Sequence, residues 1–99
     1  MKELKIIVEK IKEEVADAEE YAKLALQYKE EDKELAAAFS NLSGQELTHA
    51  DILHGQAVRL IQARKDPAPV SMQAVWDWEH DNYIERVAKV KALLEMGKK

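Results

Sequence analysis

The sequence contains no cysteine, few residues that break helices and few aromatic side chains. Without cysteine the chain has no disulfide bond, no thiolate metal site and no cysteine nucleophile. Histidine and the carboxylates are then the good metal ligands that are left. There are only three glycines, two prolines and 6% aromatic residues. This composition, rich in alanine, leucine, glutamate and lysine, favours helix.

The chain also lacks a long apolar run and an excess of positive charge. No segment has the ~20 apolar residues that span a bilayer, and glutamates interrupt the apolar part of MKELKIIVEK, so we expect no membrane span and no signal peptide. A net charge of −4 gives no long-range attraction to nucleic acid or to anionic membranes. We therefore expect a cytoplasmic protein that binds neither of them.

The periodicity of apolar residues predicts an all-α fold. It indicates helices over residues 2–28, 33–63 and 71–96, in one domain that spans residues 1–99. Because the first link is short, the first two helices should form an antiparallel hairpin. A chain of this length buries only about 60% of its unfolded surface, so association with a second copy would enlarge a modest core.

Several residues are suited to start or stop these helices. Asp32 and Ser71 are good N-caps for the second and third helices. The segment KDPAPVS should stop the second helix, because proline lacks an N–H group and disfavours helix in the residue before it. Gly97 and the lysines after it should end the third helix.

Two polar residues lie within the apolar stripe of the second helix. The stripe advances in alternating steps of four and three through Leu35, Phe39, Leu42, Glu46, His49, Leu53, Gln56 and Leu60. Ala36, Ala50, Ala57 and Ile61 widen it. An ionised carboxylate in such a stripe is costly unless it is paired or bound to a cation. Glu46 and His49, three residues apart, share one face. Their Glu-x-x-His spacing is that of the ligand pair in carboxylate-bridged di-iron and di-manganese bundles.

Such a site also needs a carboxylate from the neighbouring helix, and Glu14 is the best placed. It lies at the edge of the apolar sector of the first helix, whereas Glu13 points more to solvent. In the predicted hairpin, residues whose numbers sum to roughly 60 lie at the same level, which pairs Glu14 with Glu46. The predicted metal ligands are therefore Glu14, Glu46 and His49. Asp17 and His80 are further candidates.

The same residues also allow a structural interpretation. Glu46 would pair with a lysine, and His49 would hydrogen-bond to a backbone carbonyl or to Tyr21. His80 lies between Trp76 and Tyr83 in the third helix, where packing at the core edge explains it equally well.

Two other features indicate contact surfaces. Trp76 and Trp78 point to different sides of the third helix, so one of them should be exposed or at a subunit contact. Gly44 and Gly55 lie with other small residues on the side of the second helix opposite its stripe. We expect the third helix, or a helix of a second subunit, to pack closely there.

Residues 10 to 62 resemble one half of a ferritin-like or rubrerythrin-like bundle. The resemblance rests on EEVADAEEYAKLALQYKEEDKELAAAFSNLSGQELTHADILH. In those families a glutamate on the first helix precedes the second-helix Glu-x-x-His by a little over thirty residues. Here Glu46 follows Glu14 by 32 positions and Glu13 by 33, so the motif alone fits either glutamate.

The resemblance implies a half-bundle that oligomerisation completes, as a dimer or a higher oligomer. The chain has one Glu-x-x-His, and its third helix carries no matching motif. In this it is similar to encapsulated ferritins, whose di-iron centre forms where two subunits meet. It also resembles small ferritin-like proteins of anaerobic bacteria and their prophages. No recognisable encapsulin-targeting tail follows Leu94, so we do not expect an encapsulin shell as a partner.

The implied function is ferroxidase chemistry at a shared site. Glu14, Glu46 and His49 of two subunits would hold two iron ions, with Tyr21 near a bound ligand, and Fe(II) would be oxidised by O₂ or peroxide. The donor set leaves manganese and zinc open. The alternatives are a metal-free helical oligomer that keeps the ferritin-like shape, and a helical adaptor for another protein.

Overall fold

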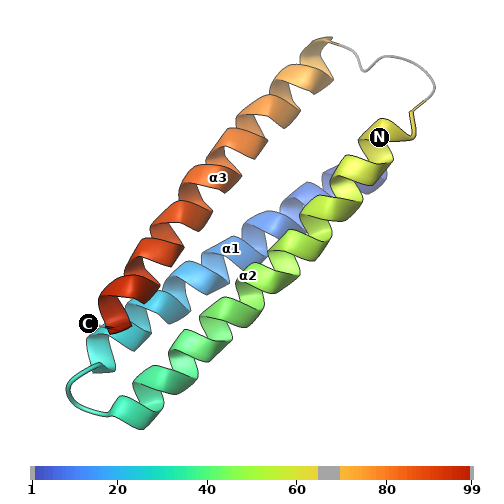
Figure 1. The fold of residues 1–99 in the computed structure, drawn as a ribbon. Helices are drawn as coiled ribbons and strands as arrows, with labels where there is room; N and C mark the ends of the chain where they lie inside the picture. The colour runs from blue at the N-terminus through green and yellow to red at the C-terminus, as the bar shows by residue number, and fades with distance from the viewer. Residues whose placement is uncertain (1, 65–69, 99) are drawn as a thin grey trace.

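The computed structural model describes residues 2–64 and 70–98, which form three α-helices and no strand (Figure 1). These are α1, Lys2–Tyr28; α2, Lys33–Gln62; and α3, Val70–Lys98. The all-α, three-helix prediction is confirmed, and each bound lies within two residues of its expected place. Over the described residues, none of the helices combines the length and apolar character needed to cross a membrane.

The helix ends match the sequence signals in part. Asp32 is the N-cap of α2, and its carboxylate accepts a hydrogen bond from the Leu35 N–H at 3.0 Å. The cap predicted at Ser71 is wrong, because α3 already begins at Val70. α3 also continues through Gly97 to Lys98, since no glycine adopts the positive φ that would end a helix there. The predicted stop by the two prolines lies outside the described residues.

α1 is the central helix of the molecule. It packs along α2 in the predicted antiparallel hairpin and also against α3, whereas α2 and α3 make few contacts with each other (Figure 1). The whole measures 54 × 17 × 15 Å. At one end, the Lys29 ammonium in the α1–α2 turn donates to the Met96 carbonyl of α3 at 3.2 Å. The described residues therefore form an elongated bundle in which α1 packs extensively against both of the other helices.

Small residues form the seam between α1 and α2. The fully or nearly fully buried members of this seam are Ala18, Ala22, Ala25, Ser43, Ala50 and Ala57. Within it the Ser43 hydroxyl donates to the Ala18 carbonyl at 2.7 Å. Small side chains let two helix backbones approach closely, and this buried hydrogen bond fixes how far along one another they lie.

The predicted apolar face of α2 is buried only in part: Ala50 and Ala57, predicted beside the stripe, are buried, and the large residues of the stripe itself are not. Leu35 and Leu42 remain 37% and 36% exposed, and His49 is exposed as well. The buried face is turned toward Ser43, Ala50 and Ala57. The larger stripe residues therefore flank the seam, and in it the small residues of α2 lie against α1, as Ala50 does against Ile11 and Val15.

α3 is held on α1 by apolar packing and by two ion pairs. Val90 lies against Ala18 and Ala22, while Tyr83 and Val87 lie against the cluster that contains Val15. Lys12 pairs with Glu79 at 2.8 Å, and Lys89 pairs with Glu19 at 3.3 Å. Trp76 is half-buried and Trp78 is 63% exposed, so the prediction that one of the two tryptophans is exposed is confirmed.

The close packing expected at Gly44 and Gly55 is not made by α3. Apart from the adjacent residues and the backbone of α2 itself, no atom of the described residues lies within 4 Å of a Cβ placed on either glycine. Because glycine inside a helix costs about 1 kcal/mol relative to alanine, Gly44→Ala should increase the free energy of unfolding by about 1 kcal/mol. Urea and thermal unfolding of the variant measure this, and Gly55→Ala should behave alike. A loss of stability would instead indicate a close neighbour, such as a second copy.

Candidate metal centre

The structure brings together the three principal ligands predicted from the sequence. Glu14 of α1 and Glu46 and His49 of α2 each offer one ligand atom, and these atoms all lie within 4.8 Å of one another. His49 Nδ1 is 3.5 Å from Glu14 Oε2 and 3.7 Å from Glu46 Oε2. An ion among the three atoms would need only small side-chain movements to reach bonds of about 2.1 Å.

The register of the hairpin explains this convergence. The hydrogen bond from Ser43 to Ala18 joins residues whose numbers have nearly the same sum as those of Glu14 and Glu46. Glu14 and Glu46 each lie about one helical turn from this hydrogen bond, so their carboxylates face each other across the edge of the seam. His49 follows Glu46 by three residues and adds its imidazole on the same side.

The cluster is partly covered and open to solvent on one side. The side chains of Glu46 and Glu14 are 19% and 25% exposed, and that of His49 is 53% exposed. No lysine pairs with Glu14 or Glu46 among the described residues, so the lysine pair considered for Glu46 is not formed there. Glu13, by contrast, is exposed and pairs with Lys10 at 3.2 Å. The structure therefore distinguishes the two glutamates that the sequence motif fits equally well.

Crowding of carboxylates raises the pKa of Glu46. The largest cause is a hydrogen bond with the Glu14 carboxyl, which favours a shared proton. Burial and the negative charge of Glu14 raise the pKa further, and Asp17 adds to this, while His49 lowers it. Two carboxylates that repel each other in this way are relieved by a proton or by a cation, and a divalent ion satisfies both at once.

On α1, the cluster lies on the side away from α3. Lys12 and Glu19, seven residues apart and so on the same side of the helix, both form ion pairs with α3. Glu14 follows Lys12 by two residues, which places it about 200° around the helix. Glu14 therefore points away from α3.

On α2 the same holds. Leu47 packs with the cluster that includes Val90 of α3, and His54 contacts the aromatic rings of α3. His49 lies two residues after Leu47, again about 200° around the helix. Within one chain, α3 therefore covers one groove of the hairpin and leaves the carboxylate cluster in the other.

The further candidates are placed differently. Asp17 is exposed and is not among the three converging ligands, although its charge acts on Glu46. His80 is not brought to the cluster, since it lies on α3 beside His54 with the ring centroids 5.1 Å apart. The ring of Tyr21 stacks on that of Phe39, with their centroids 6.1 Å apart. Tyr21 follows Glu14 by seven residues, so it lies on the same side of the hairpin.

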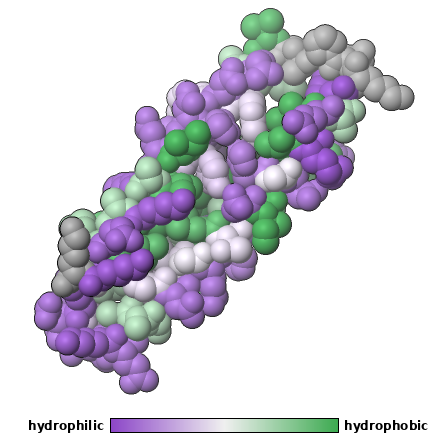
Figure 2. Space-filling view, in the orientation of Figure 1, coloured by the Kyte–Doolittle hydropathy of each residue, from purple (hydrophilic) through white to green (hydrophobic). Residues whose placement is uncertain are grey.

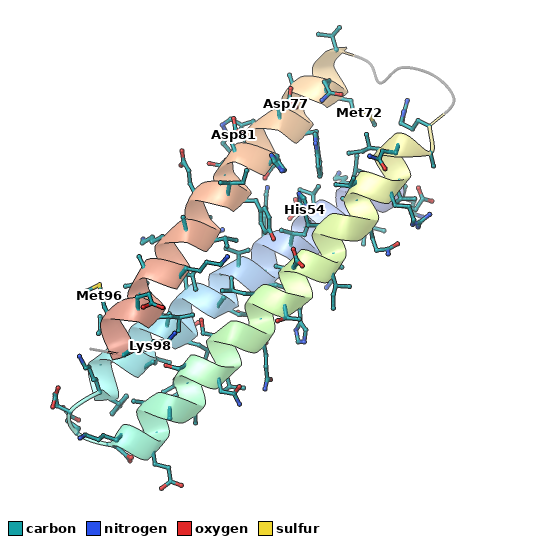
Figure 3. The ribbon with its side chains drawn as sticks, in the orientation of Figure 1. His54, Met72, Asp77, Asp81, Met96 and Lys98 are labelled. Atoms are coloured by element: carbon teal, nitrogen blue, oxygen red, sulfur yellow. The ribbon has the colours of Figure 1, made fainter. Side chains whose placement is uncertain are left out.

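His54 lies beside the predicted stripe of α2, where the sequence allows a packing or a surface residue, and the structure makes it a packing residue. It extends from α2 toward α3 (Figure 3). There its ring stacks on those of Tyr83 and Trp76, with centroid separations of 5.0 Å and 6.1 Å. Its Nε2 is buried without a hydrogen-bond partner among the described residues.

The donor set suits a hard or borderline divalent ion. Two carboxylates and one imidazole are ligands for iron, manganese and zinc. Three donors leave coordination positions open, both for a second set of protein ligands and for small molecules. The chemistry of this cluster therefore fits a divalent metal ion.

Comparisons with protein-family models, with curated proteins and with solved structures gave no match to this chain. From its fold and its candidate site, the chain is a three-helix protein with a carboxylate–histidine cluster on the side of the hairpin that α3 does not cover.

Proposed function

We propose that this chain is a ferritin-like metal-binding protein whose half-site is completed by a second copy and oxidises Fe(II). The observation that carries the proposal is the convergence of Glu14, Glu46 and His49 within 4.8 Å on a groove that α3 leaves open. The spacing of these residues along the chain, which resembles that of ferritin-like half-bundles, supports the same interpretation.

The surface around the cluster supports a second copy as the partner. Leu35 and Leu42 are more than a third exposed, and Leu53 is half-buried. All three belong to the stripe that carries Glu46 and His49. A two-fold pairing is self-complementary, so it would cover both stripes and bring two copies of the cluster face to face. The result would be a four-helix arrangement of two hairpins with α3 of each chain outside it.

Two facing clusters would supply four carboxylates and two imidazoles for two ions. The Glu46 carboxylates would bridge, and each His49 would hold one ion. Fe(II) is the substrate in this proposal. Each of two Fe(II) ions would give up one electron. O₂ would accept the two electrons with two protons and become hydrogen peroxide, or hydrogen peroxide would accept them with two protons and become two water molecules. The negative charge of Glu14 and Glu46 stabilises the more highly charged Fe(III).

Two other functions each have one observation in their favour. His49 already lies within 4 Å of both carboxylates, which would suit a metal-free helical oligomer. Trp78 is 63% exposed, which would suit an adaptor that presents an aromatic anchor to another protein.

Metal loading separates these functions. Protein purified without a metal-affinity tag should bind about one iron per chain when Fe(II) is added without oxygen, and its absorbance should rise when air is admitted. Glu46→Ala should abolish both signals because it removes the ligand that faces Glu14. Glu13→Ala is the matched control, since Glu13 is exposed and lies outside the cluster, and it should bind iron as the unmodified chain does.

The oligomeric state belongs to the same test. Light scattering should give a dimer or a larger even assembly, and iron binding should weaken on dilution below the dissociation constant of that assembly. Absence of bound metal at every loading condition, or equal loss of iron in Glu13→Ala and Glu46→Ala, would refute the proposal and favour the metal-free oligomer.

A further inference from the structure

A cleft of about 180 Å³ lies on the other side of the hairpin, beneath the amino-terminal half of α3. Its walls are mostly apolar. They include Val8, Ile11, Val15, Trp76, Trp78 and Tyr83. Figure 2 shows green apolar side chains along the middle of the face between α2 and α3, with purple polar side chains around them. The cleft contains none of the three residues of the carboxylate cluster, so it is a separate feature of the molecule.

One wall of the cleft is built from aromatic rings. His54 stacks on Tyr83 with an angle of 12° between the rings, and it also lies near Trp76 and His80. Burial lowers the pKa of His54, and His80 lowers it further, although Asp51 opposes this. His54 is therefore held in its neutral form and serves as part of the aromatic wall.

The charged groups of the cleft are distributed unevenly. Lys12 and Glu79, which both line the cleft, form an ion pair in which Lys12 Nζ is 2.8 Å from Glu79 Oε1. Arg86 also lines the cleft and is half-buried, and it forms no ion pair within residues 2–64 and 70–98. A guanidinium beside apolar walls, with no carboxylate of its own, is suited to bind a carboxylate from outside through two parallel hydrogen bonds.

We propose that this cleft binds a small aromatic carboxylate. The ring would lie against the aromatic and aliphatic walls, and the carboxylate would accept hydrogen bonds from the Arg86 guanidinium. The size is appropriate, because a cavity of about 150 Å³ with apolar walls is large enough for benzene. Offset stacking on Tyr83 and Trp76 would favour a planar ring over an aliphatic chain of equal volume.

Benzoate and toluene are the pair of ligands that tests this proposal. They have similar rings, and only benzoate carries the charge that Arg86 would bind. Calorimetric titration, together with the fluorescence of Trp76 and Trp78 in the cleft wall, should show tighter binding of benzoate. Arg86→Gln should weaken benzoate binding by about tenfold or more and change toluene binding by less than about twofold. Arg59→Gln is the matched control, because Arg59 is exposed on α2 and bonds to Gln56.

A second variant keeps the test decisive if Arg86→Gln folds poorly. Arg86→Lys retains the charge without the planar pair of donors, so it should bind benzoate with an intermediate affinity. Failure of benzoate to bind, or equal binding of benzoate by the unmodified chain and both variants, would overturn the proposal. The proposal would also be overturned if a second copy of the chain covered the cleft and benzoate did not dissociate that dimer in light scattering. Glu46→Ala should leave benzoate binding unchanged, so this result does not depend on the metal centre.

Discussion

Glu46→Gln is expected to act in opposite directions on metal binding and on stability. It should weaken Fe(II) binding by about 100-fold, because a neutral amide replaces a carboxylate of the proposed metal site, and even the loss of outer partners of a metal ligand costs about 10- to 100-fold. In the metal-free protein near neutral pH it should increase the free energy of unfolding, since it removes one of two mutually repelling carboxylates.

The pH dependence has a definite sign. The pKa of Glu46 is raised in the folded state, chiefly by its hydrogen bond with Glu14 and then by burial. Between the ordinary glutamate pKa and this raised value, the folded chain binds more protons than the unfolded chain. The free energy of unfolding of the metal-free protein should therefore fall as pH rises through that window, and level off above it. In Glu46→Gln this fall should disappear.

Urea unfolding at a series of pH values, with chelator present, measures the stability effect, and anaerobic calorimetry with Fe(II) measures the affinity. Glu13→Gln is the control, because Glu13 is an exposed neighbour outside the cluster. Destabilisation of the metal-free protein by Glu46→Gln would mean that the Glu46 carboxylate stabilises the fold by pairing with His49. That outcome would favour the metal-free oligomer.

The hairpin and the level of its polar residues could be predicted from the sequence. A short link forces the first two helices to be antiparallel, and the position of the link then determines which residues face each other. This rule pairs Glu14 with Glu46 from the sequence alone, and the structure places their ligand atoms together. The N-cap at Asp32 is equally local, since it depends only on a side chain and an N–H group three residues later.

Hydrophobicity alone finds the buried face of α2 only in part, because it places Ala50 and Ala57 beside the stripe and leaves Ser43 out. The leucines and Phe39 dominate any search for a 3–4 pattern, yet the seam centres on Ser43, Ala50 and Ala57. The energy of close backbone approach depends on the small size of residues on both helices, which a single-helix pattern does not contain. The larger residues of the stripe are left beside the seam, where Leu35 and Leu42 stay more than a third exposed.

The groove that α3 occupies was also undetermined by the sequence. Both flanks of the hairpin offer apolar residues, so pattern alone allows α3 on either flank. The ion pairs Lys12–Glu79 and Glu19–Lys89 join residues that are distant in the sequence, and they stabilise α3 on the groove opposite Glu14. His80 was therefore placed beside His54 and away from the carboxylate cluster.

Ala50→Leu is expected to be the most destabilising single change in the seam. Ala50 has no exposed surface and lies against Ile11 and Val15 between α1 and α2. A leucine adds three carbon atoms where the helices are in contact, so the free energy of unfolding should fall by about 3 kcal/mol. For a domain of this size, that corresponds to a decrease in melting temperature of roughly 12–24 °C. Thermal and urea unfolding measure the loss.

The control for this change is Ala37→Leu, because Ala37 is exposed on the same helix and should change stability by less than about 0.5 kcal/mol. A folded Ala50→Leu protein should also bind iron more weakly than the unmodified chain. Ala50 follows His49 directly, so forcing the helices apart there moves Glu46 and His49 away from Glu14. Unchanged stability would show that α1 and α2 are farther apart at Ala50 than the structure has them. Lost stability with unchanged iron affinity would mean that Glu14 is not a ligand, and would leave Glu46 and His49 to hold the ion without α1.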